Sequence, residues 1–96
     1  MSSAAVEPLL PPADETVLRA HADELRALAA RYGISDLRFA SAGKLVGHVA
    51  EDRDAFDVAD FEVAAVELLG AELRLYSDRV LGNRNVSRDL VAARPL

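Results

Sequence analysis

The chain has 96 residues, of which 51% are hydrophobic and 28% are charged, and its formal net charge at pH 7 is −5. This length fits one domain with a single modest core, and the acidic balance argues against a general affinity for nucleic acid or anionic membranes, which bind basic surfaces. The chain has no cysteine and two histidines. That composition excludes disulfides and thiolate metal sites and argues against a histidine-built zinc site.

Residues 1–11 combine small residues with Pro8 and Pro11, a composition that predicts a flexible N-terminal tail before a domain over residues 12–96. The start lacks the basic residues and long apolar run of a signal peptide, and no apolar stretch is long enough to cross a membrane. We therefore expect a cytoplasmic protein.

The first predicted helix begins near Pro12, which suits the first turn of a helix, and ends at Gly33, which suits a left-handed cap. Between these two residues, one face of the helix is marked by side chains that recur at steps of three and four. They are Leu18, His21, Leu25, Leu28 and Tyr32.

Two predicted strands follow and suggest a hairpin. "DLRFA" (36–40) alternates, with Leu37 and Phe39 on one face, and "KLVGHV" (44–49) is a second extended run. The turn between them falls at residues 42–43.

A longer helix is predicted over residues 55–69, because its apolar residues share one face and Gly70 suits its end. Asp54 is a candidate N-cap, with Asp57 three residues further on. "ELRLY" (72–76) predicts a third strand whose leucines point inward.

The last segment, "NVSRDLVAARPL" (85–96), predicts a short final helix. The order helix, strand, strand, helix, strand, helix predicts an α/β (α+β) fold, with a small three-stranded mixed sheet covered by helices. Three strands bury little apolar surface, so we expect a protein partner or self-association into a homo-oligomer.

The turn sequence "SAGK" raises the question of a phosphate-binding loop. Such a loop needs a glycine five positions before its Gly-Lys pair and a Ser or Thr after it. No glycine stands five positions before Gly43, and Leu45 follows Lys44. A tight hairpin turn is therefore the favoured interpretation.

The segment "EDRD" (51–54) has two interpretations. On a strand, Asp52 and Asp54 would aim two carboxylates at one metal, an arrangement that organises a nucleoside triphosphate for attack. In a loop they would be solvated, and Asp54 would cap the next helix. Arg53 between the two acids favours the loop.

His21 and His48 have no serine or cysteine partner at an interpretable spacing, so the sequence does not predict a catalytic triad. We expect both histidines to be half-buried and hydrogen-bonded. Arg84 and Arg88 recur at helical spacing, but no aromatic platform or larger basic cluster accompanies them. We expect an exposed helix face there and not a phosphate site.

Three stretches of the chain resemble the minimal nucleotidyltransferases, small proteins that travel with HEPN-type partners in prokaryotic toxin–antitoxin pairs. They are "LRALAARYGISDLRF", "DAFDVADFEVAAVELLGAELRLYSD" and "VAARPL". The resemblance covers about residues 16–96 and implies a truncated nucleotidyltransferase-like fold. In that family a Phe-Gly-Ser element ends one strand, a Ser-Asp-x-Asp segment supplies two metal carboxylates, and a later strand supplies a third.

The resemblance implies that the site itself is degenerate in this chain. The Phe-Gly-Ser glycine becomes Ala40, before Ser41. When the long helix is matched without gaps back through the hairpin, two metal carboxylates fall on Ala42 and Lys44, and the third falls on Arg74. Magnesium needs oxygen ligands of negative charge. We therefore expect no catalytic residue, no bound metal and no cofactor.

A rival alignment keeps Ser41 and takes Asp52 and Asp54 as the retained pair, at the cost of shortening the next helix by more than a turn. It would make the chain an active metal-dependent nucleotidyltransferase. The alignment we favour predicts a pseudoenzyme, an antitoxin that neutralises a cognate toxin, such as a HEPN-type ribonuclease, by direct binding. A self-associating scaffold is the third alternative.

The predicted partner surface lies on the acidic helix. An acidic surface suits the basic site of a ribonuclease, because complementary fields speed encounter and fix orientation. The residues expected to contact the partner are Phe56, Asp57, Asp60 and Phe61.

Overall fold

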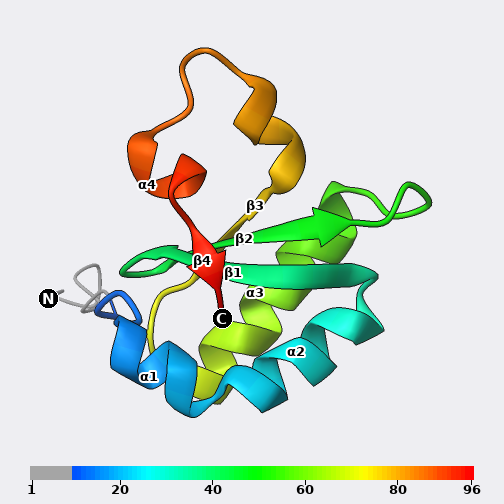
Figure 1. Cartoon of the computed structure of the whole chain (residues 1–96). Coiled ribbons are helices and arrows are strands. Elements are labelled where there is room, and N and C mark those ends of the chain that lie inside the picture. Colours follow the sequence, from blue (N-terminus) through cyan, green and yellow to red (C-terminus); the bar gives the residue numbers. More distant parts are fainter. Residues whose placement is uncertain (1–9) are drawn as a thin grey trace, which may run out of the picture.

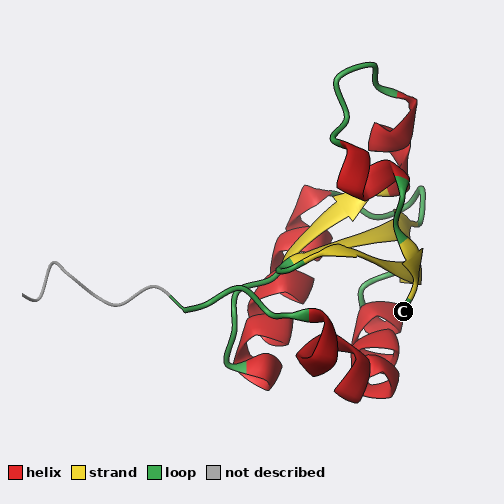
Figure 2. Ribbon diagram, turned by 60° about the vertical axis from the view of Figure 1, so that its left-hand side comes forward, coloured by secondary structure: helices red, strands yellow, loops and turns green. Residues whose placement is uncertain are grey.

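The computed structural model describes residues 10–96, which form helices packed against one mixed β-sheet (Figure 1). The sheet has four strands in the order β3-β2-β1-β4. Helices α1, α2 and α3 cover one face of the sheet, and η2 and α4 lie over the other face (Figure 2). The elements in chain order are α1 (Glu15–Ala20), α2 (Ala22–Arg31), β1 (Ile34–Ser41), β2 (Lys44–Val49), α3 (Ala55–Leu69), β3 (Arg74–Ser77), the 3-10 helix η2 (Asp78–Gly82), α4 (Arg88–Val91) and β4 (Arg94–Pro95).

The N-terminal helical region differs from the single predicted helix, because it is divided into α1 and α2 at His21. It begins at Glu15 and not near Pro12, since Asp14 is the N-cap and accepts a hydrogen bond from the Val17 amide at 2.9 Å. Pro12 instead forms an isolated parallel bridge with Glu72. The predicted tail over residues 1–11 lies outside the described residues, except for its last two.

Residues 11–13 join the hairpin to the segment that leads into β3. The Glu72 amide donates to the Pro11 carbonyl at 2.8 Å, and the Ala13 amide donates to the Glu72 carbonyl at 2.9 Å. The Gly43 amide in turn donates to the Ala13 carbonyl at 2.7 Å. These three hydrogen bonds hold residues 11–13 beside the sheet, and they explain why the segment is extended and not helical.

The predicted hairpin is confirmed, with β1 and β2 antiparallel and a two-residue turn at residues 42–43. Gly43 has φ +74°, the left-handed region that glycine tolerates best. Strict alternation along β1 is wrong, because Asp36 has φ +53° beside a register shift between Ser35 and Arg38. Ile34 and Leu37 are consequently the buried residues of this strand.

The predicted helix over residues 55–69 is confirmed as α3, with the predicted cap at each end. Asp54 and Asp57 form a capping box at its start, and Gly70 ends it with φ +65°. Phe61 and Ala65 face inward and are buried.

The predicted third strand is confirmed as β3, which pairs with β2 in parallel and makes the sheet mixed. The expectation of only three strands is wrong, because residues 94–95 add β4 to the free edge of β1. The Leu96 amide extends this contact by donating to the Leu37 carbonyl at 3.0 Å. The predicted final helix over 85–96 is accordingly reduced to α4.

The core lies between the sheet and the three helices on its covered face. Its largest side chains without exposed surface include Phe61, Leu18, Leu25, Leu45 and Leu73. No described helix is long and apolar enough to span a bilayer.

Candidate functional site

The five positions that the sequence predicts for a degenerate former site gather at one end of the sheet. Ala40 and Ser41 end β1, Ala42 lies in the turn, and Lys44 begins β2. Arg74 begins β3, and its Cα pairs with that of Lys44 across the parallel ladder. The hairpin tip and the start of β3 therefore form one local surface.

A carboxylate from the C-terminal region occupies this surface. Ser41 Oγ donates to Asp89 Oδ2 at 2.6 Å, and Lys44 Nζ lies 3.3 Å from the same oxygen. The other oxygen, Oδ1, accepts from Ser87 Oγ at 2.5 Å and from the Leu90 amide at 2.9 Å. Both carboxylate oxygens are therefore saturated, and α4 is attached to the hairpin tip through one side chain.

These donors hold the pKa of the Asp89 carboxyl well below its ordinary value. The Ser41 hydroxyl makes the largest contribution, followed by the Ser87 hydroxyl and by the hydrogen bond and charge of Lys44, while partial desolvation opposes them. The Asp89 side chain is 26% exposed, so the contact is partly shielded from water. Asp89 is thus an anion at neutral pH that neutralises Lys44.

The sequence did not predict this contact. The carboxylate that Lys44 contacts lies 45 residues downstream, in α4. Arg74 is exposed, and among residues 10–96 it forms no ion pair. In that same part of the chain, no three side chains of His, Asp or Glu are grouped so that they could hold a metal ion.

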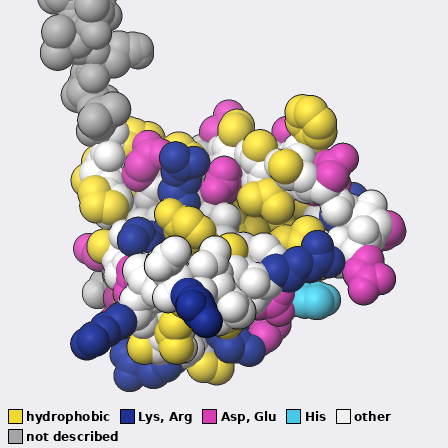
Figure 3. Space-filling model, turned by 90° about the horizontal axis from the view of Figure 1, so that it is seen from above, with side chains coloured by type: hydrophobic (Ala, Val, Ile, Leu, Met, Phe, Trp, Pro, Cys, Tyr) yellow, Lys and Arg dark blue, Asp and Glu magenta, His cyan; other side chains and the backbone are white. Residues whose placement is uncertain are grey.

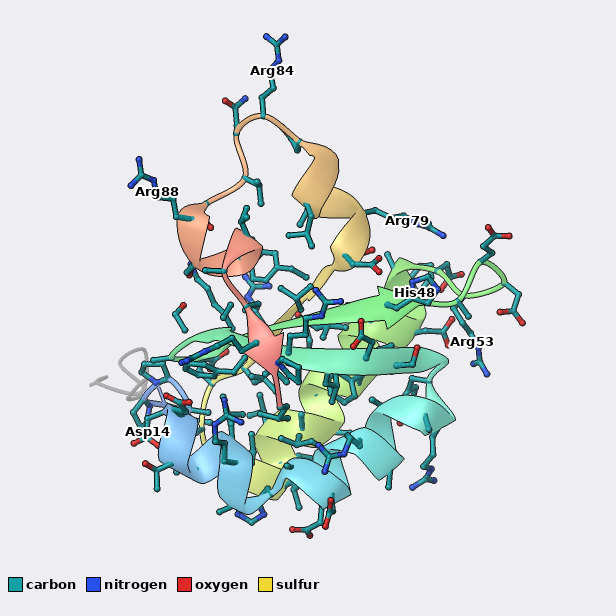
Figure 4. All side chains as sticks on the ribbon, in the orientation of Figure 1. Asp14, His48, Arg53, Arg79, Arg84 and Arg88 are labelled. Atoms are coloured by element: carbon teal, nitrogen blue, oxygen red, sulfur yellow. The ribbon has the colours of Figure 1, made fainter. Side chains whose placement is uncertain are left out.

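The segment "EDRD" lies at the opposite end of β2 and forms a turn followed by a helix cap, which confirms the loop interpretation. Asp54 Oδ1 accepts from the amides of Phe56 and Asp57, at 3.0 and 3.3 Å. Asp52 is exposed in the turn. Arg53 stands between the two acids, and Figure 4 places it at this same end of the sheet.

The capping box also affects the Asp57 carboxyl. Its oxygens accept from the Asp54 amide at 3.1 Å and from Arg53 Nη1 at 3.2 Å. These contacts lower the pKa of Asp57, and the amide makes the largest contribution. Asp57 is therefore committed to the start of α3.

The two histidines are each close to a single carboxylate. His21 Nδ1 lies 2.8 Å from Glu24 Oε1 in the half-buried junction between α1 and α2, as predicted. His48 Nδ1 lies 3.0 Å from Asp78 Oδ2, but the side chain is exposed and not half-buried. His48 belongs to the outer end of β2, where its neighbour comes from η2.

Arg84 and Arg88 do not share a helix face, contrary to the prediction. Arg84 lies in the loop after η2, and Arg88 is the first residue of α4. Both side chains extend outward from the region that lies over the sheet (Figure 4).

The predicted partner surface on α3 is only partly exposed. Phe56 is 79% exposed and Asp60 is also exposed, whereas Asp57 is held in the capping box. Phe61 has none of its surface exposed, so the expectation that it contacts a partner is wrong. Phe61 lies with Ala65 on the inner face of the helix.

Comparison with known proteins gives one informative relationship. No protein-family model matches the chain, and no curated protein matches it. A solved structure provisionally assigned as a minimal nucleotidyltransferase is similar to it, with a TM-score of 0.69 and 29% sequence identity. The match covers 86% of this chain and 96% of that one. The chain thus has a nucleotidyltransferase-like fold.

Proposed function

Starting from the nucleotidyltransferase-like fold, we propose that this chain is a non-catalytic binding protein, an antitoxin that neutralises a toxin by direct contact. Its partner is a HEPN-type ribonuclease, and the pair acts in the cytoplasm of a prokaryote. The observation that carries this proposal is the contact of Lys44 with Asp89 at the hairpin tip.

The chemistry of the hairpin tip supports a loss of nucleotidyl transfer. Magnesium in such a site is held by several carboxylate or carbonyl oxygens and clamps the phosphates of the nucleotide. At the tip, Lys44 supplies a fixed positive charge, and the one carboxylate nearby, that of Asp89, already neutralises it. A divalent cation would have to displace the ammonium and both serine hydroxyls from that carboxylate.

The length of β2 argues against the rival alignment, in which Ser41 and the pair Asp52 and Asp54 belong to one active site. Ser41 adjoins the start of β2, whereas Asp52 and Asp54 follow its end. A six-residue strand spans about 17 Å from first to last Cα. A phosphate bound near Ser41 would therefore be out of reach of a metal held by those two aspartates.

The binding role is tested with the product of the neighbouring gene, co-expressed with this chain carrying an N-terminal tag. We expect the two proteins to co-purify at a fixed ratio and the toxicity of the neighbour to be relieved. If the neighbour is not toxic and the chain purifies alone as a symmetric oligomer, the antitoxin proposal fails and the scaffold alternative replaces it.

The absence of catalysis is tested by incubating the purified chain with labelled nucleoside triphosphates and Mg²⁺ or Mn²⁺, alone and beside the neighbour's product. We expect no label on either protein. Transfer that is lost in Asp52→Ala and kept in the matched control Glu51→Ala, an exposed acid of the same turn, would overturn the proposal in favour of an active transferase.

A further inference from the structure

The outer face of α3 exposes apolar surface that the core does not use. Four large hydrophobic side chains are exposed in the described part of the chain, and two of them, Phe56 and Val63, lie on this helix, at 79% and 62% exposure. They are seven residues apart, which is about two helical turns, so they share a face. Because Phe61 and Ala65 face the core, α3 is apolar on both sides. Exposed apolar surface rimmed by charges is typical of an interaction site.

Two open grooves flank this outer face. One has a volume of about 470 Å³ and lies between α3 and the segment that leads into β3. The other, of about 650 Å³, lies between α2 and α3, and Glu67 lines both. The first groove has an apolar lining, and its rims carry three acids and one cation. The apolar residues include Val63, Val66 and Leu73. The rim acids are Glu62, Glu67 and Glu72, and the rim cation is Arg74, so the rims keep an acidic balance.

Glu62 determines which kind of partner segment fits. β3 is an edge strand, and the outward amide of Leu75 would be free to pair with an added strand. Glu62 Oε2 accepts from that amide at 2.8 Å, which caps the edge. Strand addition would have to break this bond, so the groove suits a helix that lies along α3.

The charge of the surface determines the chemistry of that helix. α3 carries four acidic residues and no basic residue, and the whole chain has a net charge of −5. A second copy of the chain would bring an equally acidic helix, and the two would repel each other. Along the uppermost rim in Figure 3, hydrophobic and acidic side chains are intermixed, whereas most Lys and Arg side chains lie elsewhere on that view.

We propose that the outer face of α3 and its groove beside Leu73 bind a basic amphipathic helix of a protein partner. The apolar side chains of that helix, at three- and four-residue spacing, cover Phe56 and Val63, and its lysines and arginines face Glu62, Glu67 and the other rim acids. This inference rests on the proposed function and names the surface by which the chain would hold its partner.

The test uses a designed peptide, so that it does not depend on the identity of the partner. A helical Leu/Lys peptide of about five turns, with all leucines on one face, is titrated into ¹⁵N-labelled full-length chain. We expect amide shift changes confined to α3 and residues 72–75, and an affinity that falls as salt is raised. Val63→Ser should weaken binding about tenfold, as loss of a central apolar contact does. The matched control Val91→Ser removes an equally exposed valine from α4 and should leave the affinity unchanged.

Three results would overturn the inference: equal binding of a scrambled Leu/Lys peptide, shift changes centred on α4, or α3 shifts that depend only on the concentration of the chain itself. The last would assign this face to self-association. Failure here is distinguishable from failure of the proposed function. If the neighbour's product still co-purifies with a Phe56→Ser and Val63→Ser double variant, the antitoxin role stands and this surface is excluded. If the peptide binds but the neighbour does not, the surface stands without the antitoxin role.

Discussion

Replacing Asp89 by alanine tests whether the contact between α4 and the hairpin tip stabilises the fold. The substitution removes the acceptor for the hydroxyls of Ser41 and Ser87 and the partner of Lys44, at 2.6, 2.5 and 3.3 Å. Hydrogen bonds to a charged group contribute about 1.5–3 kcal/mol. Because the side chain is 26% exposed, we expect the free energy of unfolding at pH 7 to fall by about 2 kcal/mol, measured by urea denaturation. For a domain of this size the melting temperature should fall by about 8–16 °C.

The dependence on pH identifies the source of that stability. The pKa of the Asp89 carboxyl is lower in the folded chain than its ordinary value of 3.8, so its contribution is present above that value and is lost as the pH falls. At pH 3 the difference between wild type and Asp89→Ala should therefore shrink by about 1 kcal/mol.

The matched control is Asp23→Ala, because Asp23 is 97% exposed and its only described ion pair is with Arg26 at the surface. It should change the free energy of unfolding by less than about 0.5 kcal/mol. The reasoning is refuted if Asp89→Ala is as stable as the wild type at pH 7, or if its deficit is the same at pH 7 and pH 3.

Two further substitutions test the packing of the sheet and the start of α3. A Cβ at Gly47 would lie 2.9 Å from Ile34 Cγ2, so Gly47→Ala should lower the free energy of unfolding, measured by urea denaturation, by about 1–3 kcal/mol. Gly82 has open space around it, so the control Gly82→Ala should be near neutral. Equal effects of the two substitutions would contradict the packing described here. Asp54→Ala should lower the free energy of unfolding by about 1 kcal/mol through loss of the N-cap, measured by thermal unfolding, whereas the control Glu51→Ala should leave it unchanged. An Asp54→Ala variant as stable as the wild type would show that the capping box is dispensable.

Elements with a strong local signal could be predicted from the sequence. The bounds of α3 follow from a capping box at one end, a glycine at the other and an apolar face between them, and all three are local properties. The second strand was predicted at its observed bounds, residues 44–49, because the turn before it and the charged segment after it are also local signals. By contrast, β4 has two residues, one of them Pro95, so it has no alternation to detect and depends on the edge that β1 offers.

The candidate site could be predicted only in part. Local matching placed Ser41, Ala42 and Lys44 together because they are adjacent in the chain, and the register of β3 brought Arg74 beside them. Asp89 could not be found in this way, since its approach depends on how η2 and the following loop turn the chain back over the sheet. No sequence signal points to this contact, because the Lys44 side chain is 39% exposed and does not require a carboxylate partner.

The lateness of β4 in the chain has a consequence for biosynthesis. Residues 34–41 leave the ribosome long before residues 94–95, so one side of β1 stays without its strand partner until those two residues have emerged. During that interval its free amides and carbonyls can pair with another nascent chain, which is a route to aggregation. Truncated products that stop before residue 88 would keep this edge open permanently, and they would also lack the α4 anchor at the hairpin tip.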